Sequence, residues 1–220
     1  MTRALLFDLD GTLLKSDPLH MQVFSDMFAE RGMTLTEEDY ARRIHGRHNS
    51  ESFPELFPGE DPVALADEKE ARFRDMLSGG FPPMPGATAL LDRAAREGWG
   101  LAVVTNAPRL NALHMLRAIG LEQRFRTLVI GDECARAKPD PMPYQQAMKA
   151  LGVTPNHAVA FEDSGSGLRA ARSSGAFTVG VRSAEDDFAL RNKGAQITIE
   201  DFEDPALESI LERLTGEAQT

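Results

Sequence analysis

Five short apolar runs, separated by segments of helical periodicity, constrain the fold of this chain more than any other feature of its sequence. A continuous apolar run bounded by glycine, proline or polar residues is typical of a strand that is buried on both faces. Strands that alternate with helices predict a mostly parallel sheet with helices on both faces, so we expect an α/β fold. The runs are Ala4–Phe7, Leu101–Val104, Thr127–Ile130, Ala158–Phe161 and Phe177–Val181.

A different pattern covers residues 15–84, where no run is typical of a buried strand. Leu19–Glu30, Glu37–Ile44 and Pro62–Leu77 have helical character, and proline clusters mark breaks and linkers. We therefore expect residues 15–84 to form a helical domain inserted into an α/β core of residues 1–14 and 85–220. Its core is expected to contain Phe53, Phe57 and Phe73.

Two aspartates, Asp8 and Asp10, follow the first apolar run and precede Gly11 and Thr12. Residues two apart on a strand point to the same side, so both carboxylates are expected to project from the carboxyl end of this strand. Ligands bind at that end in open α/β sheets. Because two adjacent carboxylates repel each other unless they share a cation or a proton, the pair predicts a reactive site.

Polar residues also follow three of the other predicted strands. Thr105 and Asn106 come after the second strand, Lys138 after the third and a loop, and Glu162 and Asp163 after the fourth. The carboxyl ends of parallel strands share one edge of the sheet, so we expect these groups to converge. The hydroxyl, the amide and the ammonium group suit a phosphoryl group, whose oxygens carry charge in the transition state.

The acidic residues suit phosphoryl transfer in the same way. Asp8, Asp163 and a main-chain carbonyl can hold Mg²⁺, a hard cation that takes a few carboxylates and keeps waters. Asp8 is then expected to attack phosphorus and to form an acyl phosphate. Asp10 is expected to protonate the leaving oxygen and later to deprotonate the hydrolytic water.

The segment Asp8–Thr12 resembles the first motif of the haloacid dehalogenase-like hydrolase superfamily. Val104–Asn106, Lys138–Pro139 and Glu162–Ser164 are similar to its second, third and fourth motifs, in the same order along the chain. The resemblance implies a Rossmann-like parallel sheet core. The inserted helices resemble the mobile cap of the subgroup that contains β-phosphoglucomutase and phosphoglycolate phosphatase.

By this resemblance Asp8 is the nucleophile and Asp10 the acid/base. The metal ligands implied are Asp8, the Asp10 carbonyl and Asp163, with Glu162 acting mainly through water. The implied activity is that of a Mg²⁺-dependent phosphatase acting on a small phosphorylated metabolite. A sugar phosphomutase and a non-catalytic binding module are the alternatives, whereas the dehalogenases of this superfamily typically lack the second aspartate.

Two residues of the inserted helices are further candidates for substrate binding. His20 either faces the substrate or is a half-buried residue of its helix. Arg47 either binds a second anionic or hydroxylated part of the substrate or lies in an exposed turn.

The composition of the chain narrows the classes of partner that we expect it to bind. The net charge of −10 disfavours a nucleic-acid partner, because phosphate neutralisation requires a basic surface. No apolar run approaches the length of a membrane span or a signal peptide, and the single cysteine excludes an intrachain disulfide. We expect a cytoplasmic protein, monomeric because its cap covers the site.

Overall fold

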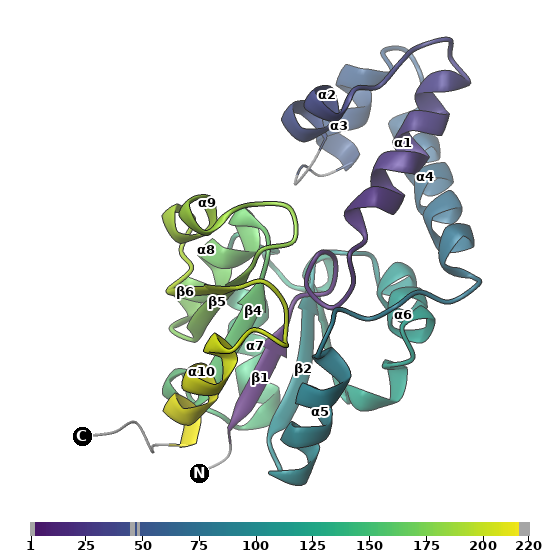
Figure 1. Ribbon diagram of the computed structural model, residues 1–220. Coiled ribbons are helices and arrows are strands. Elements are labelled where there is room, and N and C mark those ends of the chain that lie inside the picture. Colours follow the sequence, from purple (N-terminus) through teal and green to yellow (C-terminus); the bar gives the residue numbers. More distant parts are fainter. Residues whose placement is uncertain (1–2, 45–46, 48, 216–220) are drawn as a thin grey trace. The chain divides into compact units, whose positions relative to one another are not determined.

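The computed structural model describes residues 3–44, 47 and 49–215, and the chain forms two compact units (Figure 1). The core unit comprises Met1–Lys15 and Gly80–Thr220, and the helical unit comprises Ser16–Gly79.

The core unit is built on a parallel sheet of six strands in the order β3-β2-β1-β4-β5-β6. The first strand therefore lies in the middle of the sheet, with Leu5 paired to Leu101 on one side and to Val159 on the other. The chain adds strands on one side of β1 and then on the other, and ligands bind in open α/β sheets at such a switch point. The strands are β1 Ala4–Phe7, β2 Gly100–Thr105, β3 Thr127–Ile130, β4 Ala158–Glu162, β5 Phe177–Val181 and β6 Ile197–Ile199.

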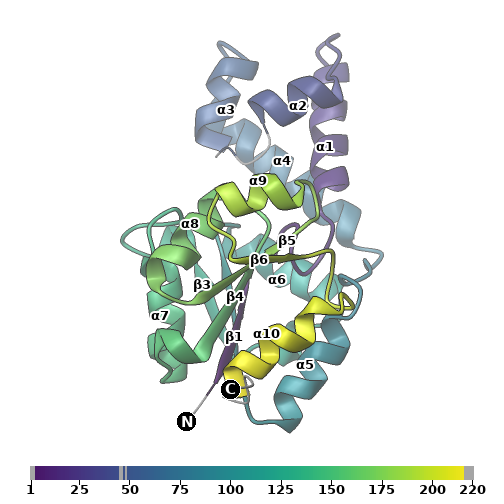
Figure 2. The ribbon, with the colours of Figure 1, turned by 60° about the vertical axis from the view of Figure 1, so that its left-hand side comes forward.

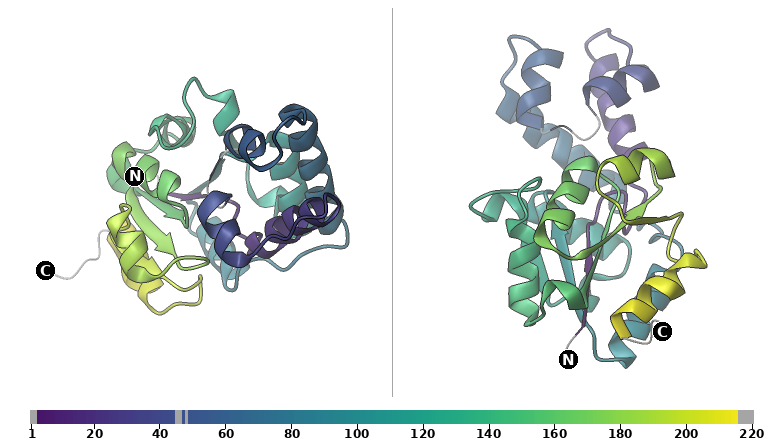
Figure 3. Two further views of the ribbon diagram at one scale, coloured as in Figure 1. Left: turned by 90° about the horizontal axis from the view of Figure 1, so that it is seen from above. Right: turned by 90° about the vertical axis from the view of Figure 1, so that its left-hand side faces the viewer.

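Helices cover both faces of this sheet, with α5 and α10 on one face and α7 and α8 on the other (Figures 2 and 3). Alternate residues of β1 supply the two cores. Ala4 and Leu6 pack in the apolar cluster with Tyr144 of α7, whereas Phe7 contacts Phe202 on the opposite face, with ring centroids 5.7 Å apart. The α-helices are α5 Ala87–Arg96, α6 Arg109–Ala118, α7 Met142–Leu151, α8 Gly165–Ser174, α9 Asp187–Asn192 and α10 Ala206–Thr215, and the 3₁₀ turns are η1 Glu122–Arg124, η2 Gly131–Glu133 and η3 Pro155–His157.

Within its described residues, the helical unit contains four α-helices around an aromatic core. Phe53, Phe57 and Phe73 are buried there, as predicted. Helix α3 was not predicted, because Pro54 and Pro58 indicated breaks. Pro54 nevertheless lies inside α3, where burial of Phe53 and Phe57 offsets the hydrogen bond that proline cannot donate. The helices are α1 Asp17–Ala29, α2 Glu37–Arg43, α3 Asn49–Leu56 and α4 Pro62–Leu77.

The expected parallel α/β sheet is confirmed, and all five predicted strands are present within one or two residues. Strand β6 and helix α9 were not predicted. Three residues of β6 are too few for a period to be recognised, and α9 spans less than two turns. Among the described residues, none of the helices is both long and apolar enough to cross a membrane.

Candidate active site

The turn after β1 positions the first acidic residues. The Asp8 N–H donates to the carbonyl of Phe161 in β4 at 2.9 Å, and the Leu13 N–H closes the turn by donating to Leu9 at 2.9 Å. Strand β1 ends at Phe7, so Asp8 and Asp10 follow the strand and do not lie within it. The tight turn, and not the strand, places Asp10, which is half-buried, whereas Asp8 is buried.

Gly11 is required in this turn for two reasons. Its φ of 70° lies in the left-handed region, which costs a residue with a side chain about 1–2 kcal/mol. A Cβ atom at this position would also lie 1.9 Å from Oδ2 of Asp163. The absence of a side chain at Gly11 therefore lets the turn after β1 approach the end of β4.

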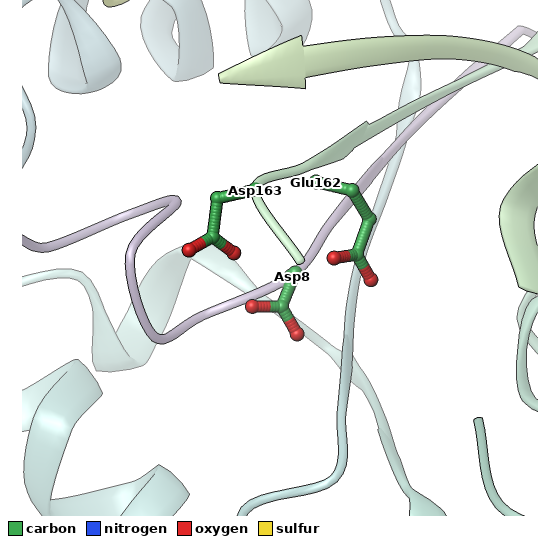
Figure 4. A group of neighbouring side chains, drawn as sticks. All are labelled: Asp8, Glu162 and Asp163. Carbon is green, nitrogen blue, oxygen red and sulfur yellow. The ribbon is translucent and has the colours of Figure 1, made fainter. Parts of the chain in front are cut away.

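Three carboxylates meet at these two strand ends. Asp8, Glu162 and Asp163 are all buried, and each offers an oxygen within 4.8 Å of the others. Figure 4 shows the three side chains gathered where the end of β4 meets the turn after β1. Asp163 is oriented by hydroxyl donors, because Thr12 donates to its Oδ1 at 3.4 Å and Ser183 to its Oδ2 at 3.1 Å.

Lys138 lies among these carboxylates, and its side chain is only 3% exposed. Its ammonium group donates to Oδ1 of Asp8 at 2.6 Å, to the carbonyl of Val104 at 2.6 Å and to Oε1 of Glu162 at 2.5 Å. A lysine ammonium has three N–H donors, so these three bonds use all of them. Lys138 therefore connects the ends of β1, β2 and β4.

Glu162 is enclosed by donors from three parts of the chain. Besides Lys138, the Tyr144 hydroxyl donates to its Oε1 at 2.6 Å and the Ser164 hydroxyl to its Oε2 at 3.2 Å. Gly167, in the first turn of α8, leaves room for the carboxylate, since a Cβ there would lie 2.0 Å from both of its oxygens. Glu162 is consequently held in a fixed, fully buried position.

Burial and mutual charge perturb the ionisation of these groups. Burial raises the pKa of Asp8 well above its ordinary value, and Glu162 and Asp10 raise it further, while Lys138 opposes them. Burial alone would lower the pKa of Lys138, but the carboxylates of Asp8 and Glu162 outweigh it and raise that pKa. Burial and the same carboxylates raise the pKa of Tyr144 well above its ordinary value, so the phenol keeps its proton.

The donor set fits a divalent cation. Three buried carboxylates carry more negative charge than the one ammonium group of Lys138 can balance. Oxygen-only donors at such a site suit Mg²⁺. These observations make Asp8 and Asp163 suitable ligands, because Glu162 is engaged by Lys138, Tyr144 and Ser164.

Thr105 and Asn106 lie beside Lys138, at the end of β2. The Thr105 hydroxyl accepts a hydrogen bond from the Ala107 N–H at 3.0 Å, which leaves its own proton for another acceptor. The Asn106 side chain brackets the main chain of Lys138, donating to its carbonyl at 3.1 Å and accepting from its N–H at 3.2 Å. Contact of either side chain with a phosphoryl group stays a prediction.

His20 and Arg47 belong to the helical unit. The His20 ring stacks on Phe73, with centroids 4.0 Å apart and planes 9° apart. Arg47 is ion-paired with Glu55 at 2.9 Å and donates to the carbonyl of Arg43 at 3.1 Å. Their roles in substrate binding stay predictions.

Sequence reasoning did not single out Tyr144, Ser183 or Gly167. Tyr144 lies near apolar residues in the sequence, and a tyrosine in such a segment gives no sign of a polar partner. Ser183 lies two residues after β5, and a search of strand ends extended to the fifth strand would have found it.

Comparison with known proteins agrees with this geometry. The family described as "Haloacid dehalogenase-like hydrolase" matches residues 5–181. The chain is 34% identical over 186 residues to "Protein CbbY" of Rhodobacter capsulatus, covering 79% of this chain and 82% of that protein. It is 33% identical over 202 residues to "Phosphorylated carbohydrates phosphatase" of Thermotoga maritima, covering 87% of this chain and 91% of that protein.

Solved structures of similar fold include two proteins that cover nearly the whole chain. A family IA, variant 3 hydrolase from Entamoeba histolytica superposes with a TM-score of 0.86 at 28% identity, covering 97% of this chain and all of that one. CbbY from Rhodobacter sphaeroides, solved in complex with phosphate, superposes with a TM-score of 0.77 at 30% identity, covering 92% of this chain and 95% of that one.

Proposed function

The chain belongs to the haloacid dehalogenase-like hydrolase family, and from that premise we propose that it is a Mg²⁺-dependent phosphatase of small phosphorylated metabolites. The observation that carries this proposal is the buried group of Asp8, Glu162 and Asp163 with Lys138 bonded to Asp8. A carboxylate nucleophile, an excess of negative charge for a cation and a fixed ammonium group are the parts that phosphoryl transfer needs.

Asp8 and Asp10 divide the chemistry between them. An oxygen of Asp8 attacks phosphorus, and the bond between phosphorus and the leaving oxygen breaks as Asp10 protonates that oxygen. Asp10 then takes a proton from a water molecule, which attacks the phosphorus of the aspartyl phosphate. Cleavage of the bond between phosphorus and Asp8 releases inorganic phosphate and regenerates both carboxyl groups.

The remaining residues bind the phosphoryl group and the metal ion. The Thr105 hydroxyl and the Asn106 amide bind the phosphoryl oxygens, and the positive charge of Lys138, whose N–H groups are already engaged, stabilises the charge that spreads over those oxygens. Asp8, Asp163 and the Asp10 carbonyl hold Mg²⁺, with Glu162 acting through water. When bound, the cation shields the phosphate from these carboxylates.

We propose a phosphorylated sugar or a phosphoglycolate-like molecule as the substrate class. This rests on relatives whose names include a phosphatase of phosphorylated carbohydrates and a phosphoglycolate phosphatase. The helical unit acts as the cap that selects the organic part of the substrate. Within it, His20 and Arg47 are our candidate contacts.

The test is to measure release of inorganic phosphate from p-nitrophenyl phosphate with and without Mg²⁺. The same measurement is then repeated with a panel of phosphorylated sugars and with phosphoglycolate. We expect turnover that requires Mg²⁺ and disappears in Asp8→Asn. A second assay supplies glucose 1-phosphate with a trace of the corresponding glucose bisphosphate. If interconversion of glucose 1-phosphate is faster than release of phosphate, the protein is instead a phosphomutase. Absence of turnover in the wild type and in Asp8→Asn alike would indicate a binding module.

A further inference from the structure

The Lys138 ammonium bonds to two carboxylates, those of Asp8 and Glu162, which compete for it. One of its N–H groups reaches Asp8, the proposed nucleophile, at 2.6 Å, and another reaches Glu162 at 2.5 Å. Both acceptors are buried, so the ammonium moves toward whichever carboxylate has the more concentrated charge. Its position at Asp8 therefore depends on what else neutralises Glu162.

Tyr144 is the residue that shares this task. Its hydroxyl donates to the same oxygen, Oε1 of Glu162, at 2.6 Å, and its side chain is fully buried. Its ring also lies beside the ammonium, with Nζ of Lys138 at 5.2 Å from the ring centroid. The ring and the hydroxyl thus act on Lys138 in separable ways, the first by contact and the second through Glu162.

We propose that Tyr144 is a positioning residue, whose hydroxyl bond to Glu162 keeps the Lys138 ammonium at Asp8. A donor on Oε1 disperses the charge of Glu162 and weakens its pull on Lys138. Without that donor, Glu162 draws the ammonium away from Asp8 and from the place where phosphoryl oxygens bind. The kinetic consequence rests on the proposed phosphatase activity, whereas the geometric consequence does not.

Tyr144→Phe is the direct test, because it removes the hydroxyl and keeps the ring. We expect kcat for p-nitrophenyl phosphate to fall about tenfold, the low end for losing a hydrogen bond to a charged group. KM should change less than threefold, because the displaced ammonium acts mainly on charge that develops in the transition state. Tyr40→Phe, in α2 of the helical unit, is the matched control for loss of a tyrosine hydroxyl and should retain wild-type kcat.

A double-mutant cycle tests the route through Glu162. In Glu162→Gln the charge that Tyr144 disperses is gone, so adding Tyr144→Phe should lower kcat by less than threefold further. Additive losses, or an unchanged kcat in Tyr144→Phe, would overturn the proposal. A purely structural role predicts a lower melting temperature with no such dependence on Glu162.

A crystal structure of Tyr144→Phe decides the geometric claim without any activity. We expect the distance from Nζ of Lys138 to Oδ1 of Asp8 to lengthen beyond hydrogen-bond range while the bond to Glu162 persists. Retention of the contact with Asp8 near 2.6 Å refutes the proposal. If the wild type shows no Mg²⁺-dependent phosphate release, the proposed function fails, and this crystallographic result still decides the role of Tyr144.

Discussion

Replacement of Gly11 by alanine tests whether the turn after β1 requires glycine because it lies so close to Asp163. Alanine at this position meets two separate costs, the left-handed φ of 70° and the overlap of its Cβ with the Asp163 carboxylate at 1.9 Å. Gly120 offers a matched control in the same unit. Its φ is also 70°, but a Cβ there would have no atom within 4 Å.

The two costs can be estimated separately. Gly120→Ala should lower the free energy of unfolding by about 1–2 kcal/mol, the cost of a left-handed backbone for a residue with a Cβ. Gly11→Ala should cost the same amount plus about 1–3 kcal/mol for overpacking. The difference between the two variants therefore isolates the overlap with Asp163, and it corresponds to roughly 2–12 °C in melting temperature at about 2–4 °C per kcal/mol.

The overlap also displaces a proposed metal ligand. We expect Gly11→Ala to weaken Mg²⁺ binding about 10–100-fold, as disturbing the support of a ligand typically does. Gly120→Ala should bind Mg²⁺ as the wild type does. Thermal unfolding and calorimetric titration with Mg²⁺ measure the two effects. Equal melting temperatures and equal Mg²⁺ affinities for the two variants would refute the reasoning.

Three further predictions concern single side chains. Asp8→Asn should abolish phosphate release while its melting temperature stays within about 2–4 °C of the wild type, the equivalent of about 1 kcal/mol; substantial residual turnover would contradict its assignment as nucleophile. Lys138→Met leaves the carboxylates of Asp8 and Glu162 buried without their cation, so the free energy of unfolding in urea at pH 7 should fall by about 3–5 kcal/mol; a loss below 1 kcal/mol would contradict this. Burial would raise the pKa of Asp204, but the N–H groups of Ala206 and Glu200 and the Arg182 guanidinium lower it below its ordinary value. Its stabilising effect is therefore present above about pH 4 and is lost as the pH falls through the lowered pKa, so Asp204→Ala should destabilise the protein at pH 7 and converge with the wild type near pH 2; a constant difference in urea midpoints between these pH values would refute the assignment.

The parallel sheet could be predicted because its long strands consist mostly of apolar residues. Buried strands such as Ala158–Glu162 have no solvent face, so their pattern differs from that of the flanking helices. Helix α3 could not be predicted, since Pro54 is unfavourable locally and only the burial of Phe53 against other helices compensates it. Helix α3 depends on tertiary packing, which the local sequence pattern does not reveal.

The groups of the candidate site were predicted more fully than their contacts. The convergence of Asp8, Lys138 and Asp163 followed from their places at strand ends. The pairing of Asn106 with the main chain of Lys138 could not be foreseen, because it depends on the path of a loop. The same holds for Tyr144, whose hydroxyl meets Glu162 only through the packing of α7 on the sheet.

The central position of β1 has a consequence for synthesis of the chain on the ribosome. Both of its neighbours are made later, β2 after residue 99 and β4 after residue 157. At about 5–20 residues per second, the apolar segment Ala4–Phe7 waits on the order of 10 s before both of its edges can pair. The helical unit is synthesised during this interval, since Ser16–Gly79 lies between β1 and β2 in the sequence. Asp8 therefore remains separated from Lys138 and Asp163 until most of the chain has emerged, and the reactive centre is among the last parts of the protein to form.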